Sequence, residues 1–300
     1  MDRIFGIDVG GTQVKARAFA ADGTVLASHQ VSLESSEKGP QRVREALEIL
    51  SRECGQSPDG IGIAAPGMAA RDESCIAFLP ESKVKLEGLR WAEFLNVEVP
   101  VRVLNDAHAA LLGECWQGAA RDYDNALLIT LGTGVGGAIL WEGQLFRGHL
   151  GRAGHFGHLC LDPDGEPGLF GMPGSLEDFI GEQTVQARTR GKFASTRDLV
   201  QAVEAGDAEA DAIWRRSLER LACGLGSLIN ILDPEAIIIG GGMARAGDTL
   251  FRPLQEALDQ LEWCPTGVGV KLVPAELGEW SGACGAAFRV RENPSREKPV

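Results

Sequence analysis

Residues 4–12 read Ile4-Phe5-Gly6-Ile7-Asp8-Val9-Gly10-Gly11-Thr12, and the predicted architecture follows from them. An apolar strand ends in a carboxylate, and a glycine pair turns the chain directly after it. Val14 to Phe19 alternates as a second strand, and Val25 to Val31 is a third strand after the hairpin signal Ala21-Asp22-Gly23. The sequence therefore predicts a three-stranded start whose first turn follows an aspartate.

The same order of elements is predicted twice along the chain. Residues 1–117 indicate β-β-β-α-β-α-β-α, and the order repeats from Ala126, with the segment Arg147 to Gly206 inserted as a candidate for substrate recognition. A duplicated α/β unit predicts two lobes with a cleft between them. We expect residues 1–117, joined by a C-terminal helix over 281–300, to form one lobe and residues 118–280 the other.

Composition and charge exclude several classes of protein. The 300 residues carry 29 Lys+Arg against 42 Asp+Glu, a net charge of −13, which disfavours nucleic acid and anionic membranes as partners. No signal-peptide pattern is present, and the longest uncharged stretch, Asn125 to Trp141, is too short to span a bilayer. Seven cysteines without a C-x-x-C pair favour a reduced cytoplasmic protein with buried thiols.

A second glycine turn, Gly132-Thr133-Gly134-Val135-Gly136-Gly137, matches G-x-G-x-x-G. A dinucleotide site requires a helix after this motif, whereas Ala138 to Trp141 is strand-like. Two interpretations remain: a plain hairpin turn, or a concavity of backbone N–H groups that binds phosphate. Gly10, Gly11 and Thr12 occupy the equivalent place in the first repeat, where Asp8 can bind Mg²⁺ through water. Together the two turns are suited to one polyphosphate.

Two further strand ends carry polar or glycine residues. Asn105 and Asp106 follow a strand and open a helix, so they are either a helix cap or a cap that also presents Asp106 as a general base to a hydroxyl group. Ile237 to Ile239 leads into Gly240, Gly241 and Gly242, which form either a wide turn or a flat surface for a planar group such as adenine.

These four motifs, in this order, resemble the ROK family (repressors, uncharacterised reading frames and sugar kinases) of the actin-like ATPase superfamily, from about Ile4 to Phe288. The resemblance implies ATP-dependent phosphorylation of a hexose or N-acetylhexosamine at its 6-hydroxyl. It implies Asp106 as the base, Asn105 and the backbone near Gly67 as sugar contacts, and Mg²⁺ near Asp8. Family kinases often dimerise, and a homodimer, like ATP or polyphosphate as donor, stays open. The chain begins at the first strand without the helix-turn-helix of the family's regulators, so no nucleic-acid partner is expected.

The sequence departs from the family pattern in its sugar and zinc motifs. His155 stands where the family has Glu, whereas His158 and Glu177 match its sugar ligands. Gly168, Phe170 and Ser175 occupy the three zinc cysteine positions, so no structural zinc is expected. His155 can therefore change the choice of sugar or weaken activity. A new metal site at His149, His155 and His158 is a less favoured interpretation.

Two other functions stay open at this point. A sugar- or nucleotide-binding sensor that has lost turnover is favoured by His155 and the missing cysteines, and disfavoured by the intact Asp8 and Asp106. A phosphoanhydride hydrolase of the same superfamily would turn over nucleotide without any sugar, and the sugar segment at Gly154 to His158 makes it less favoured.

Overall fold

The computed structural model describes residues 1–33, 39–79, 85–168 and 171–292, which form two compact units. Unit 1 comprises Met1–Asp122, Arg147–Ala153 and the chain from Glu276 onward. Unit 2 comprises Tyr123–Phe146 and Gly154–Ala275. The chain thus enters unit 1 three times and unit 2 twice.

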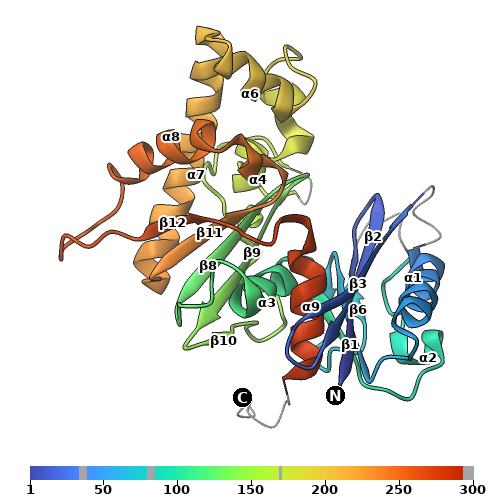
Figure 1. The fold of residues 1–300 in the computed structure, drawn as a ribbon. Helices are drawn as coiled ribbons and strands as arrows, with labels where there is room; N and C mark the ends of the chain where they lie inside the picture. Colours follow the sequence, from blue (N-terminus) through green and yellow to red (C-terminus); the bar gives the residue numbers. More distant parts are fainter. Residues whose placement is uncertain (34–38, 80–84, 169–170, 293–300) are drawn as a thin grey trace. The chain divides into compact units, whose positions relative to one another are not determined.

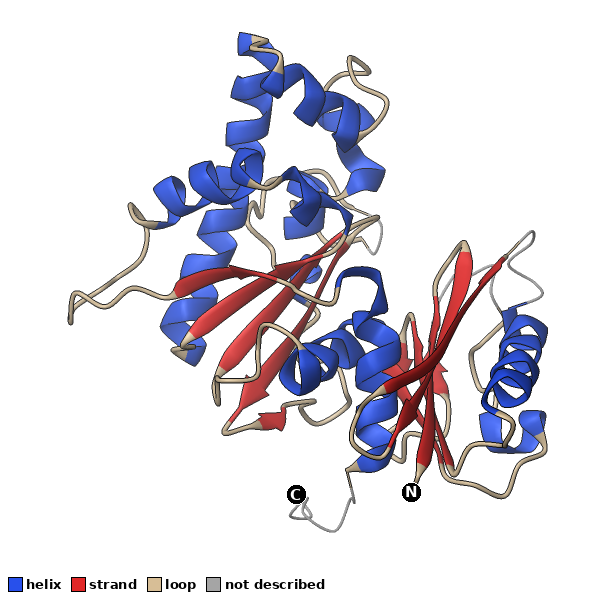
Figure 2. Cartoon of the chain, in the orientation of Figure 1, coloured by secondary structure: helices blue, strands red, loops and turns tan. Residues whose placement is uncertain are grey.

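The elements of both units are shown in Figures 1 and 2. Unit 1 contains β1 (Arg3–Val9), β2 (Gln13–Ala20), β3 (Val25–Ser32), α1 (Gly39–Cys54), β4 (Gly60–Ala65), β5 (Met68–Ala69), β6 (Ile76–Phe78), α2 (Trp91–Leu95), β7 (Val101–Asn105), α3 (Asp106–Gln117), η5 (Gly278–Trp280) and α9 (Ser281–Arg291). Unit 2 contains β8 (Ala126–Leu131), β9 (Val135–Trp141), β10 (Gln144–Leu145), η2 (Phe156–His158), α4 (Leu176–Ile180), η3 (Glu182–Thr184), α5 (Val185–Arg188), α6 (Thr196–Glu204), α7 (Ala208–Leu232), β11 (Ala236–Gly240), η4 (Gly242–Ala246), α8 (Asp248–Leu258) and β12 (Lys271–Pro274).

Each unit is built on a five-stranded sheet with the same topology. The strand order is β3-β2-β1-β4-β7 in unit 1 and β10-β9-β8-β11-β12 in unit 2. In unit 1, the central strand β1 pairs antiparallel with β2 and parallel with β4. In unit 2, the central strand β8 likewise pairs antiparallel with β9 and parallel with β11. The predicted duplication is therefore confirmed.

Several local predictions need correction. The hairpin β5–β6 is absent from the predicted order, because its strands are only two and three residues long. The predicted helix over 281–300 ends at Arg291, and residues 293–300 lie outside the described part of the chain. All seven cysteines are free, but Cys160, Cys223 and Cys264 are exposed, so the prediction of buried thiols is wrong for these three.

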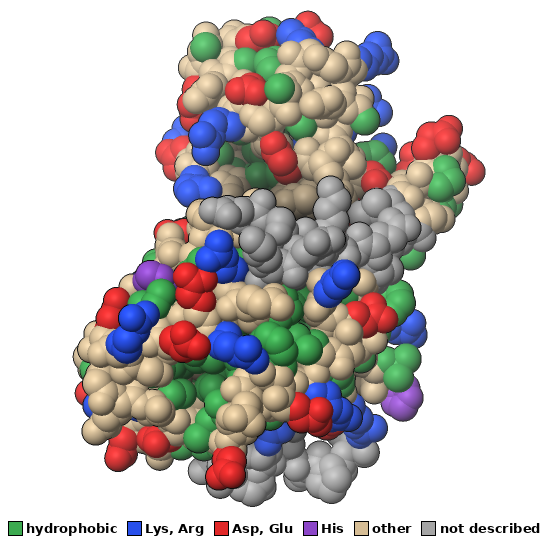
Figure 3. Space-filling model, turned by 90° about the vertical axis from the view of Figure 1, so that its right-hand side faces the viewer, with side chains coloured by type: hydrophobic (Ala, Val, Ile, Leu, Met, Phe, Trp, Pro, Cys, Tyr) green, Lys and Arg blue, Asp and Glu red, His purple; other side chains and the backbone are tan. Residues whose placement is uncertain are grey.

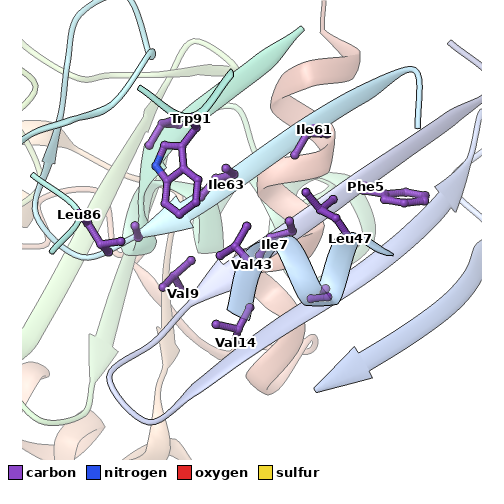
Figure 4. Close-up of a cluster of buried hydrophobic side chains, with 14 of the residues drawn as sticks. Phe5, Ile7, Val9, Val14, Val43, Leu47, Ile61, Ile63, Leu86 and Trp91 are labelled. Carbon is purple, nitrogen blue, oxygen red and sulfur yellow. The ribbon is translucent and has the colours of Figure 1, made fainter. Parts of the chain in front are cut away.

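Strand β1 divides its side chains between the two faces of its sheet. Phe5, Ile7 and Val9 join the core cluster under α1 (Figure 4). Ile4 packs with residues of α9 on the other face, where Gly6 also lies against that helix. Because side chains alternate along a strand, Asp8 shares the α9 face with Ile4 and Gly6.

Helix α9 approaches its neighbours through glycines. A Cβ atom added at Gly6 would overlap the Ala283 carbonyl, and one at Gly62 would overlap the Ala286 carbonyl. Gly285 of α9 in turn lies against the backbone of α3, where an added Cβ would overlap the Ala109 carbonyl. Backbone contact of this kind is possible only without side chains, so these glycines fix the depth at which α9 sits.

Two buried carboxylates, those of Glu73 and Glu114, bind segments of unit 1 that are distant in the sequence. Glu73 pairs with Arg289 of α9 (2.8 Å) and with Arg147 (2.9 Å), and so attaches the short Arg147–Ala153 segment to unit 1. Glu114, which is fully buried in α3, accepts hydrogen bonds from the backbone N–H groups of Glu276 (3.1 Å) and Leu277 (3.0 Å). Buried carboxylates need such partners, and here the partners are the points at which the chain re-enters the unit.

The face of unit 1 that carries α1 mixes hydrophobic and charged side chains (Figure 3). A groove on this unit is lined by Leu47, Leu95 and Val97 and is edged by Arg44 and Glu48. Such mixing is typical of a surface in contact with water. None of the described helices has the length and apolar character needed to cross a membrane.

We expect Gly285→Ala to destabilise the protein, because the new methyl group would meet the α3 backbone rather than a movable side chain. Overpacking typically costs about 1–3 kcal/mol, and urea unfolding followed by tryptophan fluorescence would measure the change. Gly224→Ala in α7 is the matched control, since its methyl would meet only the side chains of Leu176 and Leu159, at 3.4 Å or more, and alanine favours a helix by roughly 0.5–1 kcal/mol. Equal midpoints for Gly285→Ala and wild type would contradict the packing argument.

Candidate functional site

The first glycine turn joins β1 to β2 in unit 1. The Gly10 amide donates to the Gln13 carbonyl within the hairpin (2.9 Å), so it is not available to a ligand. Gly11 and Thr12 are exposed, and a Cβ atom added at Gly11 would meet nothing within 4 Å. The exposed part of this turn is therefore Gly11 and Thr12.

Asp8 lies just before this turn in an unfavourable electrostatic environment. Burial and, to a lesser extent, the negative charge of Asp106 raise the pKa of its carboxyl group from 3.8 to about 7, while the positive charge of Lys15 opposes them. Lys15 is the partner of Asp8 in the β1–β2 register. Gly282 of α9 leaves room for the carboxylate, since a Cβ atom there would stand 2.9 Å from the Asp8 Cγ.

The junction of β7 and α3 presents Asp106. Asn105 is buried and caps α3, with its Oδ1 accepting from the N–H groups of Ala107 (3.0 Å) and His108 (3.2 Å). Asp106 is the first residue of α3 and is exposed. The capping interpretation of this pair is thus correct for Asn105, and the cap leaves the Asp106 side chain at the surface of unit 1.

Gly67 is connected to the same junction. Its carbonyl accepts a hydrogen bond from the Asn105 Nδ2 at 3.0 Å. Its φ of 96° and the proximity of the Phe78 carbonyl, 2.6 Å from an added Cβ, both require glycine. Unit 1 therefore brings Asp8, Asn105, Asp106 and Gly67 into one connected set, in which Asn105 is occupied with positioning.

The second glycine turn joins β8 to β9 in unit 2. The carbonyls of Gly132 and Thr133 accept hydrogen bonds from the N–H groups of Glu182 and Gln183 in η3, both at 3.0 Å. Gly136 lies inside β9, paired with Thr130, rather than in the turn. Of the residues in the second glycine motif that were predicted to bind phosphate, only Gly132, Thr133 and Gly134 lie in the turn between β8 and β9.

Glu177 lies directly beside this turn. It is buried in the first turn of α4, and its Oε2 would be 2.5 Å from a Cβ atom on Gly134. Its Oε1 lies 3.9 Å from the Nδ1 of His158. The rings of His155 and His158 stack with centroids 6.3 Å apart. Unit 2 thus brings together the three predicted sugar contacts Glu177, His155 and His158.

The Gly240–Gly242 segment adjoins the end of β8. Gly240 is the buried last residue of β11, Gly241 has a φ of 84°, and Gly242 begins η4. A Cβ atom on Gly241 would overlap the backbone of Leu131, the residue before the second glycine turn. The adenosine motif and this turn are therefore neighbours within unit 2.

The segment at the family's zinc positions is closed by hydrogen bonds. Ser175 donates from its Oγ to the Asp178 Oδ2 at 2.6 Å and from its N–H at 3.0 Å. A Cβ atom on Gly168 would overlap the same Asp178 carboxylate, and Phe170 lies outside the described residues. Across the described chain, no three His, Cys, Asp or Glu side chains are grouped to hold a metal. The donor set therefore does not fit the family's zinc.

Sequence reasoning missed two residues that shape the Asp8 environment. Lys15 could have been found, because a two-residue-wide hairpin turn places it opposite Asp8 in the register. Gly282 could not, since its contact with Asp8 joins residues 274 positions apart. Sequence reasoning also missed His108, which does not belong to the Asp8 environment: it is buried, and its Nε2 lies 2.9 Å from the Ala153 carbonyl.

Two units with one sheet topology, each with a glycine turn in its first hairpin, define a protein of the actin-like ATPase fold. The chain belongs to the ROK family, whose model matches residues 4–293.

Named relatives and solved structures resemble the chain over nearly its whole length. A glucokinase from Streptomyces coelicolor is 29% identical, covering 97% of this chain and 98% of that protein. An N-acetylmannosamine kinase from Escherichia fergusonii is 30% identical, covering 94% and 96%. A crystal structure of a ROK family glucokinase from Streptomyces griseus, in complex with glucose and AMPPNP, is 26% identical with a TM-score of 0.83, covering 97% and 100%.

Asp8→Asn tests the electrostatic cost at this site. Because folding raises the Asp8 pKa from 3.8 to about 7, both states are protonated below about pH 3, and the unfolded state ionises first above it. The substitution should therefore leave stability unchanged near pH 3 and raise it at pH 8. The gain is on the order of 4 kcal/mol at about 1.4 kcal/mol per pKa unit. Urea unfolding at the two pH values measures this difference.

Asp22→Asn is the control of opposite sign. Hydrogen bonds from Thr24 hold the pKa of Asp22 below its ordinary value. Its stabilising effect is present above the unfolded pKa and lost on acidification, so this substitution should slightly destabilise the protein at pH 8. An Asp8→Asn variant that is no more stable than wild type at pH 8 would contradict the buried charge.

Proposed function

We propose that the chain is an ATP-dependent sugar kinase that phosphorylates the 6-hydroxyl of a hexose or N-acetylhexosamine. Membership of the ROK family and kinase relatives that match nearly its full length support the class. The observation that carries the chemistry is the pair of carboxylates in unit 1: exposed Asp106 at the start of α3, and Asp8, whose pKa Asp106 raises.

Asp106 is the proposed general base. The Asn105 cap fixes the first turn of α3, and the Asp106 Oδ1 also accepts from the Ala107 N–H at 2.9 Å. A carboxylate held in this way can take the proton of a sugar hydroxyl as it attacks the phosphoryl group. Asn105 and Gly67 act together, since the Asn105 Nδ2 holds the Gly67 carbonyl.

Asp8 is the proposed residue that would hold Mg²⁺, and the ion would supply positive charge to neutralise phosphate when bound. The residues fit this ion, because a carboxylate with a raised pKa beside a second carboxylate is stabilised by a nearby cation. Two carboxylates are few for a protein-only site, and Mg²⁺ commonly keeps waters and substrate phosphates as its other ligands.

The remaining ligand contacts are proposed in unit 2 and the first turn. Glu177, His158 and His155 orient the sugar. Gly11, Thr12 and the turn at Gly132 to Gly134 bind phosphate, and the Gly240–Gly242 segment accommodates the adenine. Its position against Leu131 supports this assignment, because the nucleoside end and the phosphate end then adjoin.

Release of ADP from Mg-ATP, measured across hexoses and N-acetylhexosamines with a no-sugar blank, tests the proposal. Release should depend on one or a few sugars, and Asp106→Asn should reduce it by roughly 10²–10⁴-fold, the usual contribution of a general base, with little change in sugar KM. Asp164→Asn, an exposed loop substitution, should leave turnover unchanged. Sugar-independent release would indicate a hydrolase, and full turnover in Asp106→Asn would remove this residue from the mechanism.

A sensor without turnover is the second candidate, and His155 is the observation that favours it. The ring of His155 stacks on His158 at 6.3 Å, whereas the ROK pattern has a Glu at this position. We expect His155→Glu to raise kcat/KM for an ordinary hexose by about tenfold or more, because a restored acceptor can pair with a sugar hydroxyl. Calorimetry should show sugar binding in both forms. No turnover in either form, together with sugar binding, would favour the sensor.

A further inference from the structure

A group of cationic side chains lies in unit 2, and none of these residues is among the sugar and nucleotide contacts proposed above. Arg188, Arg190, Lys192 and Arg216 line a cavity of about 570 Å³ between the α4–α5 region and α7, with Phe179 on its wall. The volume falls in the range of about 300–1,000 Å³ that is usual for small-molecule sites. The chain as a whole carries a net charge of −13, so a cavity lined mainly by positive side chains is not expected from its composition.

Arg188 is the innermost of these cations and is incompletely hydrogen-bonded. Its Nη1 reaches the carbonyls of Phe179 (3.4 Å) and Gly181 (3.5 Å). Its Nε and Nη2 are buried and have no hydrogen-bond partner. Burial lowers the pKa of Arg188 to about 10, with Glu182 opposing, so the group remains charged at neutral pH. A buried cationic N–H without an acceptor is costly, and an anion in the cavity that Arg188 lines would offset the charge of this guanidinium group.

The other cations differ in how far they are already neutralised. Lys192 pairs with Glu209 (2.8 Å) and with Asp207 (3.5 Å). Among the residues that the structure describes, no ion pair is formed by Arg188, Arg190 or Arg216. Glu209 also lines the cavity but is paired with Lys192, so the three guanidinium groups face the cavity without an ion-pair partner of their own.

The residues that line the cavity do not include those of the second glycine turn. On the short helix α4, Glu177 contacts this turn, and Phe179, two residues later, points to the other side. On α7, Trp214 donates from its Nε1 to the Thr249 carbonyl near α8 (2.8 Å), whereas Arg216 lines the cavity. The site is thus distinct from the proposed sugar and nucleotide contacts.

We propose that this cavity is an anion site that binds the phosphate group of a small phosphorylated molecule or of inorganic phosphate. Arginine is suited to this ligand, because its planar fork of N–H donors matches phosphate oxygens. Arg188 provides a partly buried positive charge in the cavity wall, and the exposed Arg190 and Arg216 provide guanidinium donors. This site goes beyond the proposed function and does not require catalysis.

Calorimetric titration of the full chain with inorganic phosphate and with glucose 6-phosphate, at ionic strength held constant with chloride, tests the site. The double variant Arg190→Gln/Arg216→Gln should weaken phosphate binding at least tenfold, since each guanidinium contributes a charge-assisted contact. Both side chains are exposed, so the variant should fold. Arg215→Gln is the matched control, because the neighbouring Arg215 pairs with Asp211 and Glu256 outside the cavity.

The outcomes separate this site from the proposed kinase. Unchanged AMPPNP affinity in the double variant, together with weakened phosphate binding, supports a separate anion site whether or not any sugar is turned over. Tighter binding of glucose 6-phosphate than of phosphate identifies a phosphorylated small molecule as the ligand, and equal binding identifies phosphate itself. Equal phosphate affinity in wild type and double variant, or heat no greater than with chloride, overturns the proposal.

Discussion

The contact between α9 and the sheet of unit 1 is the constraint on which the candidate site depends. Gly6 and Gly62 let the helix rest on the backbone of β1 and β4, and Gly285 lets α3 approach it from the side. Its first turn then lies on Asp8, where only a glycine, Gly282, leaves space for the carboxylate. Because α9 is the last described helix, the environment of Asp8 is complete only after the end of the chain has docked.

The packing of α9 stabilises the fold, but it also disfavours the ionised form of the Asp8 carboxylate. The packing that buries apolar residues also removes Asp8 from water and places it near Asp106, which raises its pKa to about 7. Proteins retain such costs where function requires them, and the energy is supplied by the surrounding core. In unit 2, Glu177 is likewise buried beside a glycine turn, with the Nδ1 of His158 3.9 Å from its Oε1.

Features that depend on neighbouring residues could be predicted from the sequence, and features that depend on distant residues could not. Alternation along β1 is a local signal, and so is Asp207, whose side chain caps the N-terminus of α7. The roles of Glu73 and Glu114 are not local, because their partners lie more than 70 and 160 positions away. No pattern in one chain distinguishes such a carboxylate from an exposed one.

The second glycine motif predicts more phosphate-binding residues than the structure supports. Four glycines in six residues predict a phosphate site, since a simple hairpin needs fewer. In the structure, Gly137 is required by the ring of Phe156 and Gly134 by the carboxylate of Glu177. Packing therefore accounts for two of the four, and Gly136 lies within a strand. Gly132 has no such packing requirement, because an added Cβ atom there would meet nothing within 4 Å. Gly134, which leaves room for Glu177, brings the proposed sugar contact beside the turn that is proposed to bind phosphate.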